Sequence, residues 1–243
     1  MIDSSAPAPG NNSALLLAGG MGSRMGEATP DKVLHPIHGK PVVRHVLDGF
    51  AASGVIRDFV VVYRDELQRR DLEKAIASTP SFESQRFFWT AGGAERQNSV
   101  YNGLQLVPDD STLVFIHDCV RPLVRPEIVT ELARLAREVG AACLARRVTD
   151  TIKRVESADG MPWRTRLTDV DRDRLWATET PQVFQRALIL EAYEAVRAGH
   201  HRITDDVAAV SLLGKRITLL ENPYPNPKLT TPADLDHIAC LLK

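Results

Sequence analysis

Cysteine is scarce in this chain, and the cysteines present show no pairing pattern. The 243 residues contain three, Cys119, Cys143 and Cys240, which are widely spaced and include no CxxC pair. An odd, scattered set argues against a disulfide framework and against a structural zinc site. We therefore expect reduced thiols and a cytoplasmic protein.

Long apolar runs and an excess of positive charge are also missing. No apolar run approaches the roughly 18 to 20 residues that span a bilayer. Residues 1–13 lack the basic start and apolar stretch of a signal peptide, so we expect a loose tail there and no membrane association. The formal net charge of -1 gives no global basic field for nucleic acid, so phosphate binding must depend on local basic clusters.

What the chain does contain is an alternation of apolar runs and amphipathic stretches. Its length and its 44% hydrophobic content fit one α/β domain over residues 14–243. The expected strands are residues 14–17, 58–63, 87–90, 113–117 and 141–145, and the expected helices are 45–52, 65–78, 97–106 and 126–139. This order predicts a mostly parallel sheet with helices on both faces and ligands at the carboxyl ends of its strands.

One segment, residues 149–174, breaks the alternation. It is polar and charge-rich, it contains Gly160 and Pro162, and it has neither helical periodicity nor a buried-strand run. A long surface loop is one interpretation, but ordered loops of this length are uncommon in compact domains unless they are functional. We favour a protruding β-hairpin arm.

The first motif that carries chemistry is a glycine-rich turn at residues 18–24. Glycines allow backbone N–H groups to approach phosphate oxygens without a Cβ clash. Arg24 and Lys32 add two cations suited to a triphosphate, and Gly39 and Lys40 follow. The spacing is neither that of a Walker A loop nor that of the dinucleotide fingerprint.

A glycine pair at residues 92–93 leads into the helix expected at 97–106. A plain strand-to-helix turn explains it by itself. The functional alternative has backbone groups reading a base edge, with Ser99 as a hydrogen-bonding wall.

The sequence IHDCVRP at residues 116–122 directly follows a buried strand. Asp118 is placed to hold Mg²⁺, a hard cation that prefers carboxylate and phosphate oxygens, and Arg121 suits a phosphate. A surface Asp–Arg pair is the alternative. We expect His117 to be a packed strand-end residue.

Two later segments are best explained by helix starts. Asp205 and Asp206 are expected to cap and charge a helix that begins at Thr204. Thr231 and Pro232 fit the N-cap and first turn of the last helix, which leaves Lys228 as the functional candidate there.

Taken together, these motifs resemble the 2-C-methyl-D-erythritol 4-phosphate cytidylyltransferases, over about residues 14–242. The resemblance implies a Rossmann-like fold, a homodimer formed through the β-arm, and transfer of CMP from CTP to a polyol phosphate with Mg²⁺. Its site residues fall into four groups. The catalytic residues are Arg24, Lys32, Lys228 and Arg172; the nucleotide-binding residues are Ala18, Gly19, Gly20, Gly22, Gly93, Ala94, Ser99 and Cys119; the substrate-binding residues are Arg121, Thr151, Arg172 and Thr180; and Asp118 binds the metal.

The chain departs from the family pattern at several positions. Asp31 is inserted before Lys32, Gly19 replaces an alanine, Cys119 and Val120 replace a pair of alanines, and Pro225 replaces an Asp. The alternatives are a ribitol-5-phosphate cytidylyltransferase, a uridylyltransferase, a molybdopterin nucleotidyltransferase and a non-catalytic nucleotide-binding scaffold. The motif from Lys32 to Pro41 also resembles the N-acetylglucosamine-1-phosphate uridylyltransferases, which do not share the later motifs.

Overall fold

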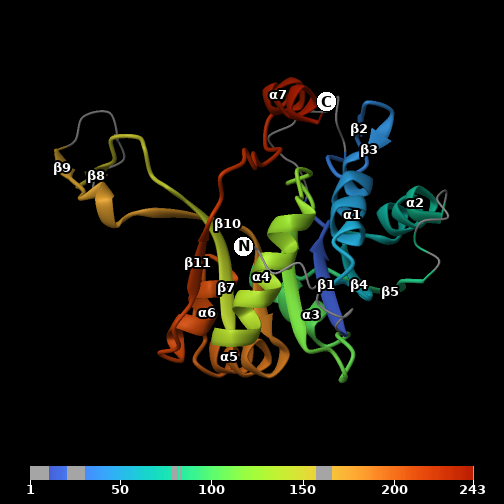
Figure 1. The fold of residues 1–243 in the computed structure, drawn as a ribbon, viewed down its shortest axis with the longest axis horizontal. Coiled ribbons are helices and arrows are strands. Elements are labelled where there is room, and N and C mark those ends of the chain that lie inside the picture. The colour runs from blue at the N-terminus through green and yellow to red at the C-terminus, as the bar shows by residue number, and fades with distance from the viewer. Residues whose placement is uncertain (1–10, 21–30, 78–81, 83, 157–165, 243) are drawn as a thin grey trace, which may run out of the picture.

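A seven-stranded sheet forms the centre of the molecule in the computed structural model, which describes residues 11–20, 31–77, 82, 84–156 and 166–242 (Figure 1). The strands lie in the order β11, β7, β10, β6, β1, β4, β5. Their bounds are β1 (Asn12–Leu17), β4 (Asp58–Tyr63), β5 (Arg86–Ala91), β6 (Leu113–Asp118), β7 (Ala141–Arg147), β10 (Trp176–Gln185) and β11 (Thr218–Glu221).

All strands of this sheet run parallel except β10, which is antiparallel to both β6 and β7. The carboxyl ends of β1, β4, β5, β6, β7 and β11 therefore share one edge with the start of β10. The central strands β4 and β6 are buried along their whole length. Such continuous apolar runs are typical of a sheet covered on both faces.

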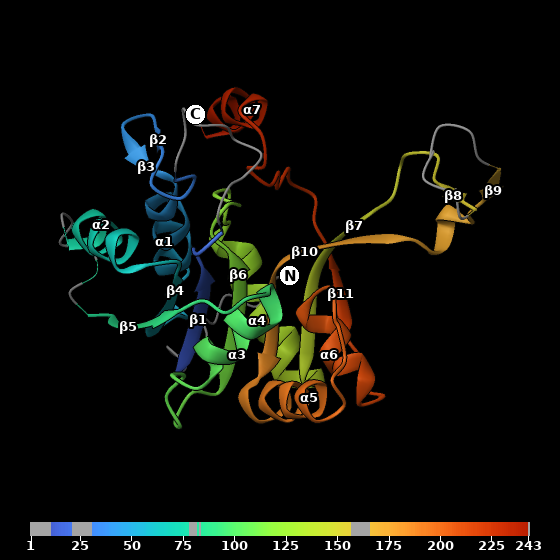
Figure 2. The ribbon, with the colours of Figure 1, turned by 180° about the vertical axis from the view of Figure 1, so that it is seen from behind.

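Two layers of helices cover the sheet (Figures 1 and 2). One face packs against α1 (Val42–Ala52), α2 (Glu66–Ala77) and α4 (Pro126–Val139), and the other against α3 (Arg96–Leu104), α5 (Arg186–Ala198) and α6 (Asp206–Leu212). The predicted α/β class, with a mostly parallel sheet between two helical layers, is confirmed.

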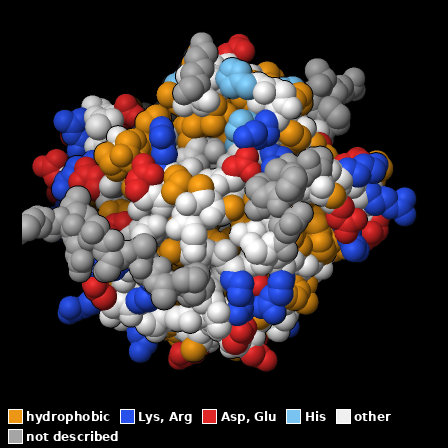
Figure 3. Space-filling model, turned by 45° about the vertical axis from the view of Figure 1, so that its right-hand side comes forward, with side chains coloured by type: hydrophobic (Ala, Val, Ile, Leu, Met, Phe, Trp, Pro, Cys, Tyr) orange, Lys and Arg blue, Asp and Glu red, His pale blue; other side chains and the backbone are white. Residues whose placement is uncertain are grey.

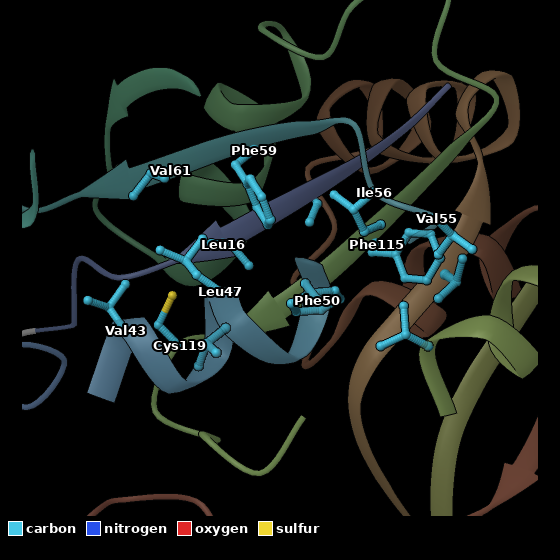
Figure 4. Close-up of a cluster of buried hydrophobic side chains, with 14 of the residues drawn as sticks. Leu16, Val43, Leu47, Phe50, Val55, Ile56, Phe59, Val61, Phe115 and Cys119 are labelled. Atoms are coloured by element: carbon cyan, nitrogen blue, oxygen red, sulfur yellow. The ribbon is translucent and has the colours of Figure 1, made fainter. Parts of the chain in front are cut away.

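The first core lies under α1 and contains an aromatic cluster. Phe50 meets Phe115 edge to face, with ring centroids 6.2 Å apart, and Leu47 and Val43 continue the apolar stripe of the helix (Figure 4). Cys119 belongs to this same cluster. The sulfur therefore packs as a small apolar group.

The last helix, α7 (Ala233–Leu241), packs on a short hairpin. The hairpin consists of β2 (Pro36–Ile37) and β3 (Lys40–Pro41), and its Ile37 shares a small core with Ile238 of α7. The turn between the two strands has φ of +50° at His38 and +74° at Gly39, the left-handed region that glycine enters without strain.

The N-terminal boundary predicted at residue 13 is too late. Asn12 and Ser13 lie in β1 and are fully buried. The Asn12 amide donates to the Val55 carbonyl oxygen at 2.8 Å, and the Ser13 hydroxyl pairs with that of Ser111 at 2.7 Å. Asn12 and Ser13, which we assigned to the tail from the sequence, are thus strand residues with hydrogen-bond partners inside the protein. Residues 1–10 of the predicted tail lie outside the described part.

Residues 149–174 are called the arm from here on, and their described parts, 149–156 and 166–174, project from the edge where β7 ends and β10 begins (Figures 1 and 2). Within the arm, β8 (Lys153–Val155) pairs antiparallel with β9 (Leu167–Asp169), and a short 3₁₀ turn, η2 (Arg172–Arg174), leads back to the sheet. The predicted hairpin is confirmed for these strands, and residues 157–165 lie outside the description. No described helix is long and apolar enough to cross a bilayer.

Candidate active site

A cleft of about 580 Å³ opens at the carboxyl edge of the sheet. It lies where β1, β5 and β6 end, at the carboxyl ends of strands where the sequence predicted a ligand site. The residues that line it come from six segments of the chain. They are Leu17, Ala18, Gly19, Gly20, Lys32, Val62, Arg64, Gly92, Gly93, Ala94, Glu95, Arg96, Ser99, Asp118, Val120, Lys228, Leu229 and Thr230.

The glycine-rich turn starts directly after β1 and passes close to the neighbouring strand end. A Cβ on Gly19 would lie 3.1 Å from the Tyr63 carbonyl carbon and 3.2 Å from the Arg64 nitrogen. Glycine thus permits a tight backbone approach at this position. Ala18, Gly19 and Gly20 all line the cleft, whereas Gly22 and Arg24 lie outside the described residues.

Gln68 of α2 holds the start of this turn, a role that the sequence did not signal. Its side chain is nearly fully buried, and its amide donates to the Ala18 carbonyl oxygen at 3.0 Å and to the Asp31 carboxylate at 2.7 Å. Arg64 also reaches Asp31, at 3.3 Å. The inserted Asp31 is therefore tied to α2 and to the residue that follows β4, immediately before the predicted catalytic lysine.

Lys32 is mostly buried and lines the cleft. Its Nζ donates to the carbonyl oxygens of Thr230 at 3.1 Å and Leu229 at 3.5 Å. The first predicted lysine thus meets the segment that contains the second, Lys228, although the two are almost two hundred residues apart in sequence.

The glycine pair after β5 forms a second wall of the cleft. The Gly93 N–H donates to the Ser99 hydroxyl at 3.0 Å, and that hydroxyl donates to the Glu95 carbonyl oxygen at 3.2 Å. A Cβ on Gly93 would lie 2.3 Å from the Cβ of Asn98, so a larger residue cannot fit there without movement. In this structure Ser99 shapes the turn, and Gly93 and Ala94 face the cleft.

Asp118 ends β6 and is compensated by two cations. Its Oδ2 accepts from Lys228 Nζ at 2.7 Å, and its Oδ1 lies 3.3 Å from Nε of Arg96. Burial by itself would raise the pKa of this carboxyl, but the charges of Arg96 and Lys228 outweigh burial and hold the pKa well below its usual range. Asp118 is therefore ionised at neutral pH.

Arg96 is a cleft residue to which we assigned no role from the sequence. Its guanidinium also pairs with both carboxylate oxygens of Asp206, at 3.1 and 2.7 Å. Asp205 is the N-cap of α6 and accepts from the Ala208 N–H at 3.1 Å, close to the helix start predicted at Thr204. Asp206 has the further partner Arg96, which lies 110 positions earlier in the chain and could not be found from local spacing.

Two residues predicted to bind the acceptor lie behind the cleft. The Thr180 hydroxyl accepts from the Asp118 N–H at 3.1 Å, and Arg121 donates to the Asn226 carbonyl oxygen at 2.5 Å. Burial lowers the pKa of Arg121. In this structure both support the segments that carry Asp118 and Lys228, and neither lines the cleft.

Cys119, expected among the nucleotide contacts, points the other way. It is fully buried in the core under α1, and burial raises the pKa of its thiol (Figure 4). The reason is strand alternation, because neighbouring residues at the end of β6 face opposite sides and Asp118 takes the cleft side. His117, as predicted, packs edge to face on Phe50 at 5.2 Å, and burial lowers its pKa to about 4.

Thr151 and Arg172 lie in the arm and do not line the cleft of their own chain. Both are exposed, and Arg172 donates to the Thr149 carbonyl oxygen at 2.9 Å. The structure thus separates the predicted acceptor-binding residues of the arm from the predicted nucleotide-binding residues of the sheet edge.

Two carboxylates, those of Glu95 and Asp118, are among the described residues that line the cleft. Among the described residues, no group of three or more His, Cys, Asp or Glu side chains could hold a metal ion. Mg²⁺ usually needs only one or two protein carboxylates when substrate phosphates complete its shell. Asp118, ionised and lining the cleft, fits that requirement.

The surface of the molecule carries both signs of charge. Figure 3 shows Lys and Arg side chains interspersed with Asp and Glu over one face. The cations of the cleft are thus a local feature, in agreement with the near-zero net charge.

Comparison with known proteins points to one family. A family model described as 2-C-methyl-D-erythritol 4-phosphate cytidylyltransferase matches residues 13–243. Proteins of that name from Geobacillus kaustophilus and Pelotomaculum thermopropionicum are 39% and 35% identical to this chain, over 93% and 95% of it and 94% and 93% of their own lengths.

Solved structures agree with this result. The Thermus thermophilus enzyme of the same name superposes with a TM-score of 0.73 at 26% identity, over 95% of this chain and 98% of its own. A 4-diphosphocytidyl-2C-methyl-D-erythritol synthase from Anaerococcus prevotii gives a TM-score of 0.81 over 96% of both chains; at 24% identity it supports the fold alone.

Proposed function

The chain belongs to the 2-C-methyl-D-erythritol 4-phosphate cytidylyltransferase family, and from that premise we propose how its cleft performs the reaction. The protein is a cytidylyltransferase that transfers CMP from CTP to 2-C-methyl-D-erythritol 4-phosphate and releases pyrophosphate, a step of non-mevalonate isoprenoid synthesis. The observation that carries this function is the family match over residues 13–243, together with a cleft that Lys32, Lys228 and Asp118 all line.

The chemistry is an in-line displacement at the α-phosphorus of CTP. A phosphate oxygen of the acceptor forms the new P–O bond, and the bond from the α-phosphorus to the bridging oxygen breaks, so that pyrophosphate leaves with the electron pair. The nucleophile is already an anion, so a strong general base is not needed. Positioning and neutralisation of charge are therefore the main contributions of the protein.

We assign the glycine-rich turn and the lysines to the nucleotide phosphates. Backbone N–H groups of Gly19 and Gly20 can approach phosphate oxygens, and Lys32 lies in the same cleft. Lys228, whose Nζ lies 2.7 Å from Asp118, would supply a second cation to the reacting phosphate. Arg24 would add a further cation from outside the described residues.

We assign Mg²⁺ to Asp118 and the phosphate oxygens. The ion would supply charge neutralisation for the triphosphate. We expect pyrophosphate release to fall to background in EDTA and to return with added Mg²⁺. Full activity in the presence of the chelator would contradict this assignment.

We place the acceptor between the cleft and an arm from a second subunit. Within one chain, Thr151 and Arg172 are exposed on the arm and do not line the cleft. A homodimer in which each arm reaches the partner's cleft would bring these residues to the acceptor. A cytoplasmic location is supported by three free cysteines, two of them buried and unpaired.

The test is pyrophosphate release by the purified protein with CTP and a panel of acceptors. We expect release with 2-C-methyl-D-erythritol 4-phosphate and little with ribitol 5-phosphate or sugar 1-phosphates. A preference for ribitol 5-phosphate would move the protein to the related polyol reaction. No release with any acceptor would favour a nucleotide-binding scaffold.

A further inference from the structure

Arg96, the first residue of α3, joins two aspartates from distant parts of the chain. Its Nη1 and Nη2 meet Asp206 at 3.1 and 2.7 Å, and its Nε lies 3.3 Å from Asp118. The planar guanidinium thus uses its two terminal nitrogens for a bidentate pair and its Nε–H for the second carboxylate. A lysine cannot make this set of contacts.

Asp206 is a fixed anchor for Arg96. Its side chain is fully buried at the first turn of α6, and the Tyr193 hydroxyl donates to its Oδ1 at 2.6 Å. The side-chain oxygen of Gln182 in β10 accepts from the Asp206 N–H at 3.1 Å, which fixes the backbone as well. The position of Arg96 is therefore set from the interior of the protein.

Asp118 is held from two sides. Arg96 lies at its Oδ1 and Lys228 at its Oδ2, while its backbone N–H donates to Thr180. The two aspartates and the two cations cancel in charge. If Lys228 moved away, Asp118 would keep Arg96 as a hydrogen-bonded cationic partner, so its carboxylate would not be left without one.

We propose that Arg96 is a positioning residue whose charge, fixed by Asp206, allows Asp118 to release Lys228 to the substrate phosphates. In this structure Lys228 rests on Asp118, with its Nζ 2.7 Å from Oδ2. When phosphate oxygens enter, Lys228 turns to them, and Arg96 stays on Asp118 beside the Mg²⁺ that we assign to that carboxylate. This inference rests on the proposed function, because it concerns the same cleft and the same lysine.

The test compares two double variants. Arg96→Gln alone would leave the buried carboxylate of Asp206 without a cation. The variant tested is therefore Arg96→Gln with Asp206→Asn, which replaces the ion pair by two amides. The matched control is Arg86→Gln with Asp58→Asn. Asp58 is also a fully buried aspartate that Arg86 pairs through two N–H groups, at 2.6 and 2.9 Å, but it lies at the opposite edge of the sheet.

We expect the Arg96 and Asp206 double variant to lose at least about tenfold in kcat, since a direct donor to the reacting centre is worth roughly 10² to 10³. The KM for CTP should change by less than about threefold, because the glycine-rich turn is untouched. Arg96→Lys should give an intermediate kcat. The control variant should lose thermal stability and keep kcat within about twofold. A normal kcat in the Arg96 and Asp206 variant, or equal losses in both variants, would overturn the proposal.

A second measurement does not depend on turnover. In crystals grown with inorganic pyrophosphate, wild-type Lys228 should lie on the phosphate, whereas in the Arg96 and Asp206 variant it should stay on Asp118. If Lys228 occupies the same position in both proteins, or if pyrophosphate is absent from the wild-type cleft, the proposal is wrong. If instead the wild type shows the predicted exchange but makes no product with CTP, the proposed function fails and the inference about Arg96 stands.

Discussion

Lys32 lies beside the backbone of the segment that carries Lys228, and it is the residue whose removal should affect turnover most cleanly. Lys32→Ala deletes a cation from the cleft without disturbing the apolar core. We expect kcat to fall roughly 10² to 10³-fold while the circular dichroism spectrum stays that of the wild type. The measurement is steady-state pyrophosphate release.

Lys40→Ala is the matched control for this substitution. Lys40 pairs with Asp48 at the surface, at 2.8 Å, and does not line the cleft. Its removal should leave kcat unchanged. A near-normal kcat in Lys32→Ala would show that the assignment of Lys32 to catalysis is wrong.

Local sequence patterns identify some of the residues near the cleft and miss others. Asp118 and Lys228 stand out because Asp118 ends a buried strand and Lys228 precedes the last helix, each within a recognisable run. Gln68 and Asp206 do not stand out, because a polar residue in an amphipathic helix is usually solvated, and their partners come from other elements. The burial of the Cys119 side chain was not predicted for a related reason, since sequence adjacency to Asp118 does not reveal which side of the strand end a residue faces.

At the scale of the element, the start of α7 depends on one carboxylate. Asp234 accepts from the backbone N–H groups of Thr230 and Thr231, at 2.8 and 2.7 Å, and from both threonine hydroxyls. The predicted N-cap, Thr231, is therefore a donor to Asp234, and the cap position is taken by Pro232. The same segment supplies the Thr230 carbonyl oxygen that receives Lys32.

Asp234→Asn should destabilise the protein by about 1 to 2 kcal/mol near neutral pH, because it removes a charged acceptor at a helix start. Burial opposes ionisation, but the backbone N–H groups of Thr231 and Thr230 outweigh it and lower the pKa of Asp234 to about 2. The folded-state pKa lies below the unfolded one, so this stabilisation is present above pH ~4 and is lost as the pH falls towards 2.

Urea unfolding of wild type and Asp234→Asn over a pH series checks this prediction. The difference in the free energy of unfolding should be constant near neutral pH and shrink through the acid range. A difference that does not depend on pH would mean that the carboxylate's charge contributes nothing.

The arm is the second element with a separable role. Arg172→Ala should raise the KM for the acceptor much more than the KM for CTP, because the proposed contact is with the acceptor phosphate. Arg174, in the same 3₁₀ turn with a side chain that is 88% exposed, is the control position for alanine. Equal effects of Arg172→Ala on both substrates would count against the arm as an acceptor site.

Most elements could be predicted because apolar periodicity is local. The helix predicted at residues 126–139 is found with those bounds, and β4 likewise. Strand β10 was missed, and with it the single antiparallel strand of the sheet. Its segment contains Thr180 and Pro181 beside a register irregularity, so it gives no clean run of alternating residues.

If the protein is a dimer formed through the arm, substitutions in the arm should lower the mass of the species that sediments. Val155 and Leu167 face each other across the hairpin and are 48% and 59% exposed, apolar area that a partner could cover. Replacing both with Asp should shift the sedimenting species from twice the chain's 26.8 kDa towards the single chain.

The same variant should lose affinity for the acceptor while its affinity for CTP changes little. Binding of each ligand measured by calorimetry separates the two effects. If the wild-type protein sediments as a monomer at assay concentrations, the proposed dimer, in which each arm reaches the partner's cleft, is wrong.

The antiparallel direction of β10 also bears on how this molecule can diversify. Because β7 and β10 are hydrogen-bonded neighbours, the two ends of the arm leave the sheet side by side. The length and sequence of the arm can therefore change, because the entropic cost of closing a loop grows only slowly with its length. Evolution, or an engineer grafting a different hairpin at residues 149–174, can change the arm that we propose to contact the acceptor, while the strand ends that line the cleft keep their architecture.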